Sequence, residues 1–416
     1  MTHLVRSRAR ERNLRSFAIM AVVFFMLMVS PVLQATGSGE AASDYSAETD
    51  EETVERLATM DPGAAQDELS SRSVDERVGY SIALAYDGLE AGSLARAEQW
   101  LEWGGGQVPE DDFPGLHAEI LTERAVVSEL GGNMRASVSF ARRAARLFAQ
   151  SGRSEDELST LARLAGIQHR LGQLSDGIET ADAVIDRLDE LDDPLRQADV
   201  LSNAAMMRYK LGWFEEVPGL LDRAYERYEA EGNLDGMGTV YRFRGNYHGS
   251  RNDAELARSY YRKAAEKYEQ TGNLHDLANV RFNSGLSVMQ EGRYDDAVSY
   301  LEDAVDGFLE AGSVSGAGMA STELAVALWS AGRWQAADSA LAIGIRMLDS
   351  SQSLRRLARA YSIRATFQGA FGNTDGALDS LNEARNLYDE LGLRAEAAAI
   401  QDQIDELDED TPRGGI

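Results

Sequence analysis

Hydrophobic and polar residues alternate with a helical period over most of this chain. Between about residues 78 and 392 apolar side chains recur at i, i+3 and i+4, as in the segment 297–304, where Ala297, Val298, Leu301 and Ala304 face one way. Proline is scarce, with 7 residues, while alanine and leucine are abundant, and this composition favours helix over strand. The pattern predicts an all-α protein.

The breaks between helical segments recur with a period of 40 residues or a multiple of 40. Most of them hold a glycine, and the exception, Asn252, is the residue type that most readily replaces glycine where φ is positive. A second set of breaks lies twenty residues further on, at Gly152, Gly232, Gly272, Gly312 and Gly392, with Asp112, Asp192 and Gln352 in the other repeats. Each repeat should therefore be a helix of about fourteen residues, a tight turn, a helix of about sixteen and a short loop. The tight turns are expected at Gly92, Gly132, Gly172, Gly212, Asn252, Gly292, Gly332 and Gly372.

The same period brings small residues into register. Seven residues before the turns stand Ala85, Ala125, Ala165, Ala205, Gly245, Gly285, Ala325 and Ala365. Five residues after the turns most positions are alanine, and nine after them most are large, as at Leu301 and Leu341. Small residues at fixed positions let two helices approach closely, so these columns predict the contact within each helical hairpin.

These columns resemble the tetratricopeptide repeat. The best unit combines Asn283-Ser284-Gly285, the turn 292–297 (Gly-Arg-Tyr-Asp-Asp-Ala), Tyr300-Leu301 and Ala304. The resemblance covers residues 78–392, with a 40-residue period in place of roughly 34, as in the longer-helix subclass of regulators and scaffolds. It implies a right-handed α-solenoid of about eight helical hairpins, which binds a protein or an extended peptide on the concave surface formed by the first helices.

The N-terminus has the layout of a targeting segment. Five arginines between residues 6 and 15 precede an apolar run from Phe17 to Leu33, and Ala35-Thr36-Gly37 fits a small-x-small cleavage site. Residues 1–35 are therefore interpreted as a signal peptide, with an uncleaved N-terminal membrane anchor as the alternative. Either way the remainder is expected to be exported, to the periplasm or the extracellular space.

The remaining segments frame the repeats. Residues 36–50 are expected to form a flexible linker, and 51–77 an irregular helical cap interrupted at Pro62. Residues 393–408 should form a capping helix with an outer polar face, because the end of a solenoid needs one. Residues 409–416 are expected to be a disordered tail.

Composition narrows the chemistry. The net charge of −28 argues against binding to nucleic acid or to anionic membranes, so contact with a membrane is expected only through an uncleaved N-terminal segment. The chain has no cysteine, its 5 histidines show no metal-binding spacing, and no phosphate loop or nucleophile elbow occurs. Neither a catalytic site, a metal nor a cofactor is expected.

The candidate binding residues lie ten, nine, six, three and two positions before each turn, a set called here the first-helix face. The central first helices are basic within an acidic chain, and they carry asparagines whose amides suit an extended peptide backbone. An ordinary polar solenoid face remains the alternative reading of this pattern. The candidates are Arg163, Arg170, Asn203, Tyr209, Lys210, Arg242, Asn246, Phe282, Asn283 and Trp329.

Three functions fit the pattern. The first is a scaffold that binds another protein or an extended peptide, with an acidic segment or a C-terminal carboxylate as the favoured ligand. The second is a regulatory solenoid that senses a peptide or small ligand. The third is an accessory subunit of an envelope enzyme.

Overall fold

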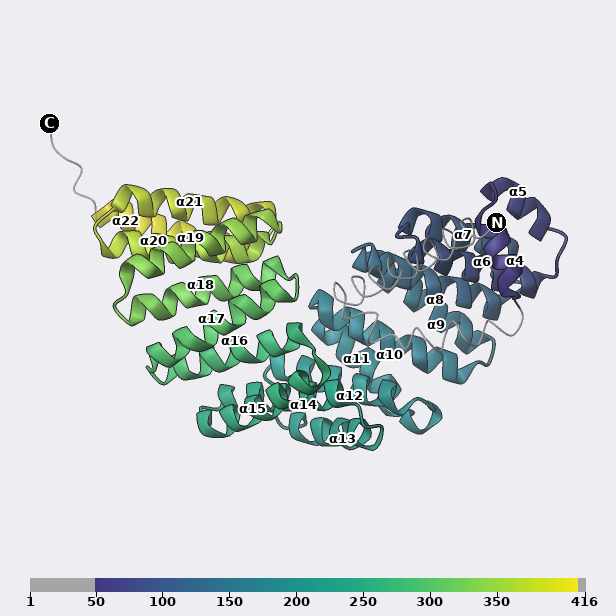
Figure 1. Ribbon diagram of the computed structural model, residues 1–416, viewed down its shortest axis with the longest axis horizontal. Coiled ribbons are helices and arrows are strands. Elements are labelled where there is room, and N and C mark those ends of the chain that lie inside the picture. Colours follow the sequence, from purple (N-terminus) through teal and green to yellow (C-terminus); the bar gives the residue numbers. More distant parts are fainter. Residues whose placement is uncertain (1–48, 411–416) are drawn as a thin grey trace, which may run out of the picture. The chain divides into compact units, whose positions relative to one another are not determined.

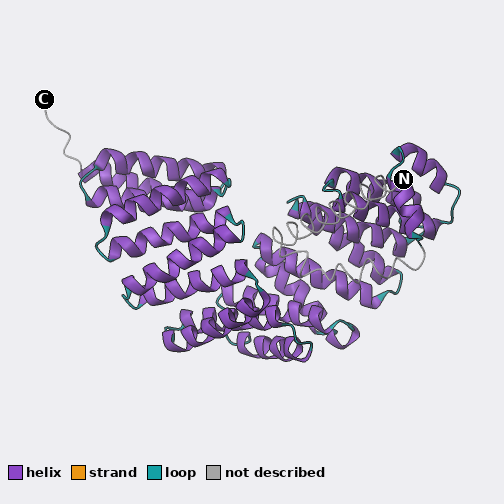
Figure 2. Cartoon of the chain, in the orientation of Figure 1, coloured by secondary structure: helices purple, strands orange, loops and turns teal. Residues whose placement is uncertain are grey.

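The computed structural model describes residues 49–410, and in this range every regular element is a helix (Figure 2). The chain divides at Gly232 into two compact units, called unit 1 and unit 2. The predicted signal peptide or anchor, most of the linker and the final residues of the tail lie outside the described residues. No described helix combines the length and the apolar character needed to cross a bilayer.

Unit 1 holds an N-terminal pair of short helices followed by four helical hairpins (Figure 1). Its helices are α4 (Glu51–Ala58), α5 (Pro62–Leu69), α6 (Val74–Glu90), α7 (Leu94–Gln107), α8 (Pro114–Leu130), α9 (Met134–Gln150), α10 (Ser154–Leu171), α11 (Leu174–Ile185), the 3₁₀ turn η1 (Leu188–Glu190), α12 (Pro194–Lys210) and α13 (Val217–Ala230).

Unit 2 holds four more hairpins and a closing helix. Its helices are α14 (Leu234–Ser250), α15 (Ala254–Thr271), α16 (Leu274–Gln290), α17 (Tyr294–Glu310), α18 (Val314–Ser330), α19 (Trp334–Ser350), α20 (Leu354–Ala370), α21 (Thr374–Glu390) and α22 (Arg394–Asp410). The first helices of these repeats have 17 residues, three more than expected, because polar N-terminal turns add to the apolar stretch. Asn273, for example, accepts a hydrogen bond from the backbone N–H of Asp276 and so begins α16 with a polar turn.

The turn within each hairpin has the backbone conformation that the sequence predicts. All eight turn residues have positive φ, and Asn252 adopts it with φ 61°. An added Cβ at the seven glycines would meet no atom within 4 Å, so backbone conformation and not crowding explains the residue type. The expected eight turns are confirmed.

The second set of breaks divides into two kinds. Gly152, Gly232, Gly272, Gly312, Gly392 and Gln352 have positive φ, with 52° at Gln352. Asp112 and Asp192 are not among the positive-φ residues. Each of them instead precedes a proline that begins a helix, Pro114 in α8 and Pro194 in α12, where the fixed φ of proline starts the helix without a left-handed residue.

Small residues let the two helices of a hairpin pack closely. A Cβ at Gly245 would stand 2.4 Å from the Tyr261 ring, and one at Gly285 would stand 2.8 Å from Leu301. Such distances are below van der Waals contact, so a larger residue would push the second helix away. Leu301 itself is fully buried, with 0% exposure, at the centre of the core of unit 2.

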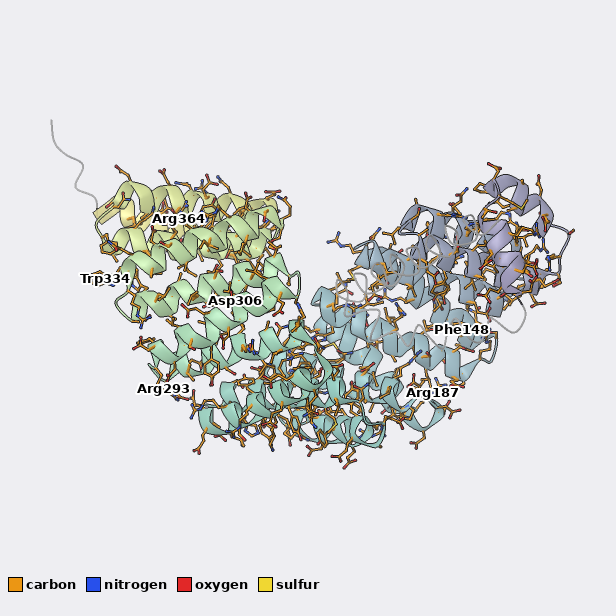
Figure 3. All side chains as sticks on the ribbon, viewed as in Figure 1. Phe148, Arg187, Arg293, Asp306, Trp334 and Arg364 are labelled. Atoms are coloured by element: carbon orange, nitrogen blue, oxygen red, sulfur yellow. The ribbon has the colours of Figure 1, made fainter. Side chains whose placement is uncertain are left out.

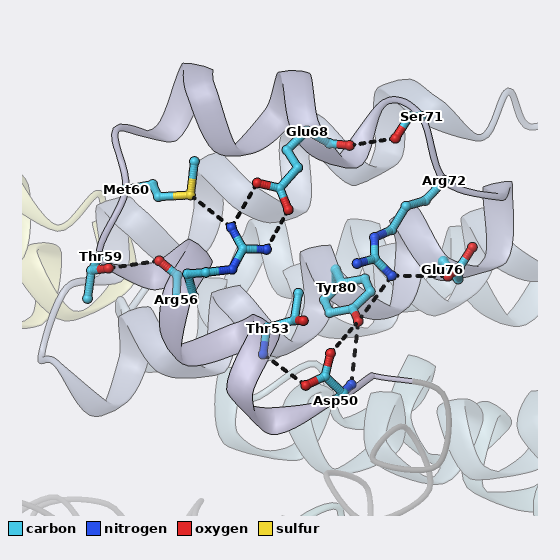
Figure 4. Close-up of polar contacts among 10 residues, drawn as sticks. All are labelled: Asp50, Thr53, Arg56, Thr59, Met60, Glu68, Ser71, Arg72, Glu76 and Tyr80. Atoms are coloured by element: carbon cyan, nitrogen blue, oxygen red, sulfur yellow. Dashed lines mark hydrogen bonds and ion pairs between the residues drawn. The ribbon is translucent and has the colours of Figure 1, made fainter.

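The N-terminal cap is held by polar contacts (Figure 4). Arg56 of α4 makes two hydrogen bonds to the carboxylate of Glu68 on α5, at 2.8 and 2.5 Å. Asp50 caps α4 and lies 3.5 Å from the hydroxyl of Tyr80 on α6. Pro62 stands at the start of α5, which explains the break between the two short helices.

The backbone at one turn provides a direct test of this account. Gly372→Ala should lower the free energy of unfolding by about 1 kcal/mol, because alanine is strained at a φ of 74°. Gly369→Ala, three residues earlier in α20 and with open space around its Cα, should instead raise it by about 0.5 kcal/mol. Urea titration followed by circular dichroism measures both, and shifts of the same sign would contradict the account.

Candidate functional site

In unit 1 two candidate arginines share one buried carboxylate. Glu129 of α8 has only 2% of its side chain exposed, and Arg163 of α10 binds one of its oxygens at 3.0 Å. Arg170, two helical turns further along α10, binds the other oxygen and keeps 42% of its side chain exposed. A buried carboxylate is costly unless it is paired, so Glu129 holds both arginines in position.

Two further candidates of unit 1, Asn203 and Lys210, are joined by hydrogen bonds through His169. His169 Nδ1 lies 3.0 Å from Asn203 Oδ1, and the Nζ of Lys210 lies 2.9 Å from His169 Nε2. This arrangement suits a neutral imidazole that donates to Asn203 and accepts from Lys210. The structure thus links α10 and α12 through side chains of the first-helix face. Tyr209, the remaining candidate, has its ring 5.9 Å from that of Phe214.

The first-helix face of unit 1 continues toward the N-terminus beyond Arg163, the first of the candidate residues. Glu123 of α8 accepts a hydrogen bond from the hydroxyl of Tyr86 on α6 at 2.7 Å. Burial raises the pKa of Glu123, while the bond from Tyr86 opposes that rise. Both residues occupy register positions of the face, as does Glu129, so the same 40-residue period applied to the first two repeats would have found them.

A half-buried acid lies on α12. Asp199 accepts a hydrogen bond from the hydroxyl of Tyr228 on α13 at 2.5 Å. Burial raises the pKa of Asp199 to about 6, and the bond from Tyr228 acts in the opposite direction. Asp199 stands one helical turn before Asn203, so its charge state bears on the polarity of this face.

In unit 2 two candidate asparagines contact each other. Asn283 of α16 donates from Nδ2 to Asn246 Oδ1 on α14 at 3.2 Å. The same oxygen accepts a bond from the hydroxyl of Tyr261 at 2.9 Å. The pair is therefore oriented by a tyrosine of the second helix, and Asn246 keeps its amide nitrogen for other partners.

The other candidates of unit 2 have internal partners. Arg242 lies against the ring of Phe243 at 4.7 Å and lies 4.0 Å from Asp276. Phe282 is 8% exposed and belongs to the core of unit 2, which leaves little of its ring for a ligand. Trp329 stacks on Phe367 with ring centroids 4.1 Å apart. Glu323 also lies on the first-helix face, although it is not among the candidates. Its buried carboxylate is paired with Arg359 at 2.5 Å.

The faces of both units suit recognition by hydrogen bonds and charge. Within residues 49–410 no group of three or more His, Asp or Glu side chains is placed to hold a metal ion. The arrangement offers amides, guanidinium groups and an ammonium group, which bind peptide backbones and carboxylates.

Comparison with known proteins places the fold. No protein-family model matches the chain, and no curated protein matches its sequence. The structure of a Rap protein complexed with Competence and Sporulation Factor is similar over 80% of this chain and 98% of that one, with a TM-score of 0.53 and 14% identity. Apo RapI is similar over 66% of this chain and 99% of that one, at 0.56 and 13%.

Two further solved structures are similar to this chain. The apo form of the quorum sensor NprR from B. thuringiensis is similar over 69% of this chain and 81% of that one, with a TM-score of 0.53 and 14% identity. A signal transduction ATPase with a tetratricopeptide repeat sensor, from Pyrococcus horikoshii, matches 85% of this chain and 55% of that one, at 0.51 and 15%. The chain therefore has the fold of a tetratricopeptide-like α-solenoid, and this prediction is confirmed.

The shifted pKa of Asp199 predicts a pH dependence of stability. Below about pH 4 the carboxyl group of Asp199 is protonated in both the folded and the unfolded chain. Between pH 4 and 6 it loses its proton only in the unfolded chain. Stability should therefore fall with rising pH in this window, by on the order of 2 kcal/mol from this one group. Asp199→Asn should remove that part of the fall, whereas exposed Asp192→Asn should not. Urea midpoints at pH 4.5 and 7 measure the difference, and equal falls in both variants would refute the assignment.

Proposed function

We propose that this protein is a scaffold that binds a protein or an extended peptide through the first-helix faces of its repeats. The observation that carries the proposal is the pair of side-chain networks on these faces, one in each unit, built from asparagines, arginines, a lysine and a histidine. The likeness to a Rap protein complexed with Competence and Sporulation Factor supports it at the level of the fold.

The proposed ligand is an extended segment with a carboxylate. In unit 2 the Asn246–Asn283 pair presents amide groups at the spacing of successive repeats, which suits a peptide backbone. In unit 1 Arg170 keeps two-fifths of its side chain in solvent and Lys210 is exposed, although the chain as a whole carries −28. Positive groups gathered in an acidic protein favour an acidic segment or a C-terminal carboxylate.

The site of action proposed is outside the cytoplasm. The basic flank and apolar run of residues 1–35 support export, with cleavage or with retention as an anchor. Fractionation of cells that produce the full chain, with sequencing of its N-terminus, separates these cases. Recovery of an intact N-terminus from the cytosol would end this part of the proposal.

The asparagine pair supplies the test of binding. Peptide-array binding by the full chain identifies ligands, and affinity for the best of them is then measured by calorimetry. Asn246→Ala with Asn283→Ala should weaken that affinity at least tenfold, because two buried amide contacts to the ligand backbone are lost. Asn382→Ala is the matched control, since Asn382 lies on the second helix α21 and bonds its own helix at Leu378. Unchanged affinity in the double variant would rule out this face.

A regulatory sensor is the second candidate. It is favoured by similar structures that include a quorum sensor and a protein with a tetratricopeptide repeat sensor. A sensor should change its radius of gyration in solution scattering when the array-selected peptide is added, because repeat proteins transmit small rotations between neighbouring repeats. A radius of gyration that stays constant at saturating peptide would rule out the sensor function and remain consistent with the scaffold function.

A further inference from the structure

Four aromatic side chains form a continuous cluster at the hairpin turns of the last two repeats of unit 2. Trp329 of α18 and Phe367 of α20 are stacked, with centroids 4.1 Å apart and planes 6° from parallel. Phe371 meets Trp329 edge-on at 5.3 Å, and Trp334 meets Phe371 edge-on at 5.9 Å with an angle of 81°. The cluster thus runs from the first-helix face to the turn, where it ends in two perpendicular rings.

The outer end of this cluster is open to solvent. Phe367 is 6% exposed, whereas Phe371 is 63% and Trp334 is 54% exposed. Figure 3 shows Trp334 at the outer margin of its helices. Both rings keep more than half of their surface in water, and an exposed cluster of apolar side chains is typical of an interaction surface.

Acidic residues outnumber basic ones next to the two exposed rings in the sequence. Arg333, beside Trp334, is paired with Asp295 at 2.6 Å, so its charge is matched. Asp338 is exposed one helical turn after Trp334 on α19. Asp375 is exposed in the first turn of α21, the helix that follows the turn at Phe371. Beyond the Arg333–Asp295 pair, the charged residues nearest in sequence to Trp334 and Phe371 are these two acids.

We propose that the corner between Trp334 and Phe371 binds an arginine or lysine side chain of a basic partner segment. Aromatic faces carry negative potential, and a cation between two perpendicular rings can approach the face of one and remain close to the other. Asp338 and Asp375 add attraction of the same sign. A lipid surface fits less well, because a chain with a charge of −28 is repelled by anionic membranes.

This corner differs from the first-helix site in position and in ligand charge. The proposed function assigns an acidic ligand to Arg170 and Lys210 in unit 1 and a peptide backbone to the asparagine pair in unit 2, each unit taken by itself. The corner instead takes a basic segment at the turns. Each can therefore fail without the other, and the variants that test them share no residue.

The test uses the full chain labelled with 5-fluorotryptophan. Its fluorine resonances are assigned with Trp334→Phe and Trp213→Phe. An eight-residue peptide of alternating arginine and glycine is titrated at 150 mM salt, with an uncharged glutamine–glycine peptide of the same length and zwitterionic lipid vesicles as the other probes. Trp213 is the internal control, because it is 52% exposed and is in no ring pair within the described residues.

The arginine peptide should shift the Trp334 resonance and leave that of Trp213 unchanged. Trp334→Ala with Phe371→Ala should reduce affinity for this peptide at least tenfold, and Asp338→Asn with Asp375→Asn should reduce it severalfold. Trp213→Ala should have no effect. Equal shifts of both tryptophans would show attraction by net charge alone and overturn the proposal. So would a Trp334 response to the glutamine peptide or to vesicles that matches or exceeds the response to arginine.

Discussion

One backbone requirement recurs in every repeat, and the rest of the structure depends on it. The residue that joins the two helices of each hairpin has φ between 61° and 78°, a conformation that glycine and asparagine adopt at low cost. This turn sets where the second helix begins, and small residues such as Gly245 and Gly285 then allow the helices to touch. Because the turn recurs every 40 residues, the same positions of each first helix fall on one face of a unit.

Buried acids organise the charged groups on that face. Glu129 holds two arginines in unit 1, and Glu323 holds Arg359 in unit 2. A paired carboxylate restrains an arginine that would otherwise sample many rotamers, so less conformational entropy is lost when a ligand binds. The acids of this chain therefore act in part as fixed supports for the cations that the proposed ligand would meet.

The fold was largely predictable, because turn residues and small residues leave a direct trace in a repeated sequence. Asn252 illustrates this, since its role follows from its place in the period. The partners of the candidate residues were less predictable. Glu129 binds arginines 34 and 41 residues away, and the residue types alone do not predict which acid pairs with which arginine. Phe282 shows the opposite case, because a residue at a position of the first-helix face can still pack its ring in the core.

The aromatic corner at Trp334 and Phe371 also had no separate signal in the sequence. Each ring stands at a different turn, and only the packing of neighbouring repeats brings them to 5.9 Å. The packing of neighbouring repeats thus brings together turn residues whose proximity is not evident from the sequence.

The central claim is that the first-helix faces receive a peptide or protein. Site-specific photo-crosslinking in producing cells tests it most directly, with the crosslinker placed in turn at Asn203, at Asn283 and, as a reference, at the exposed Glu302 on the second helix α17. The account predicts a discrete adduct of the same partner from Asn203 and Asn283 and none from Glu302. Adducts from Glu302 alone, or equal adducts from all three positions, would contradict it.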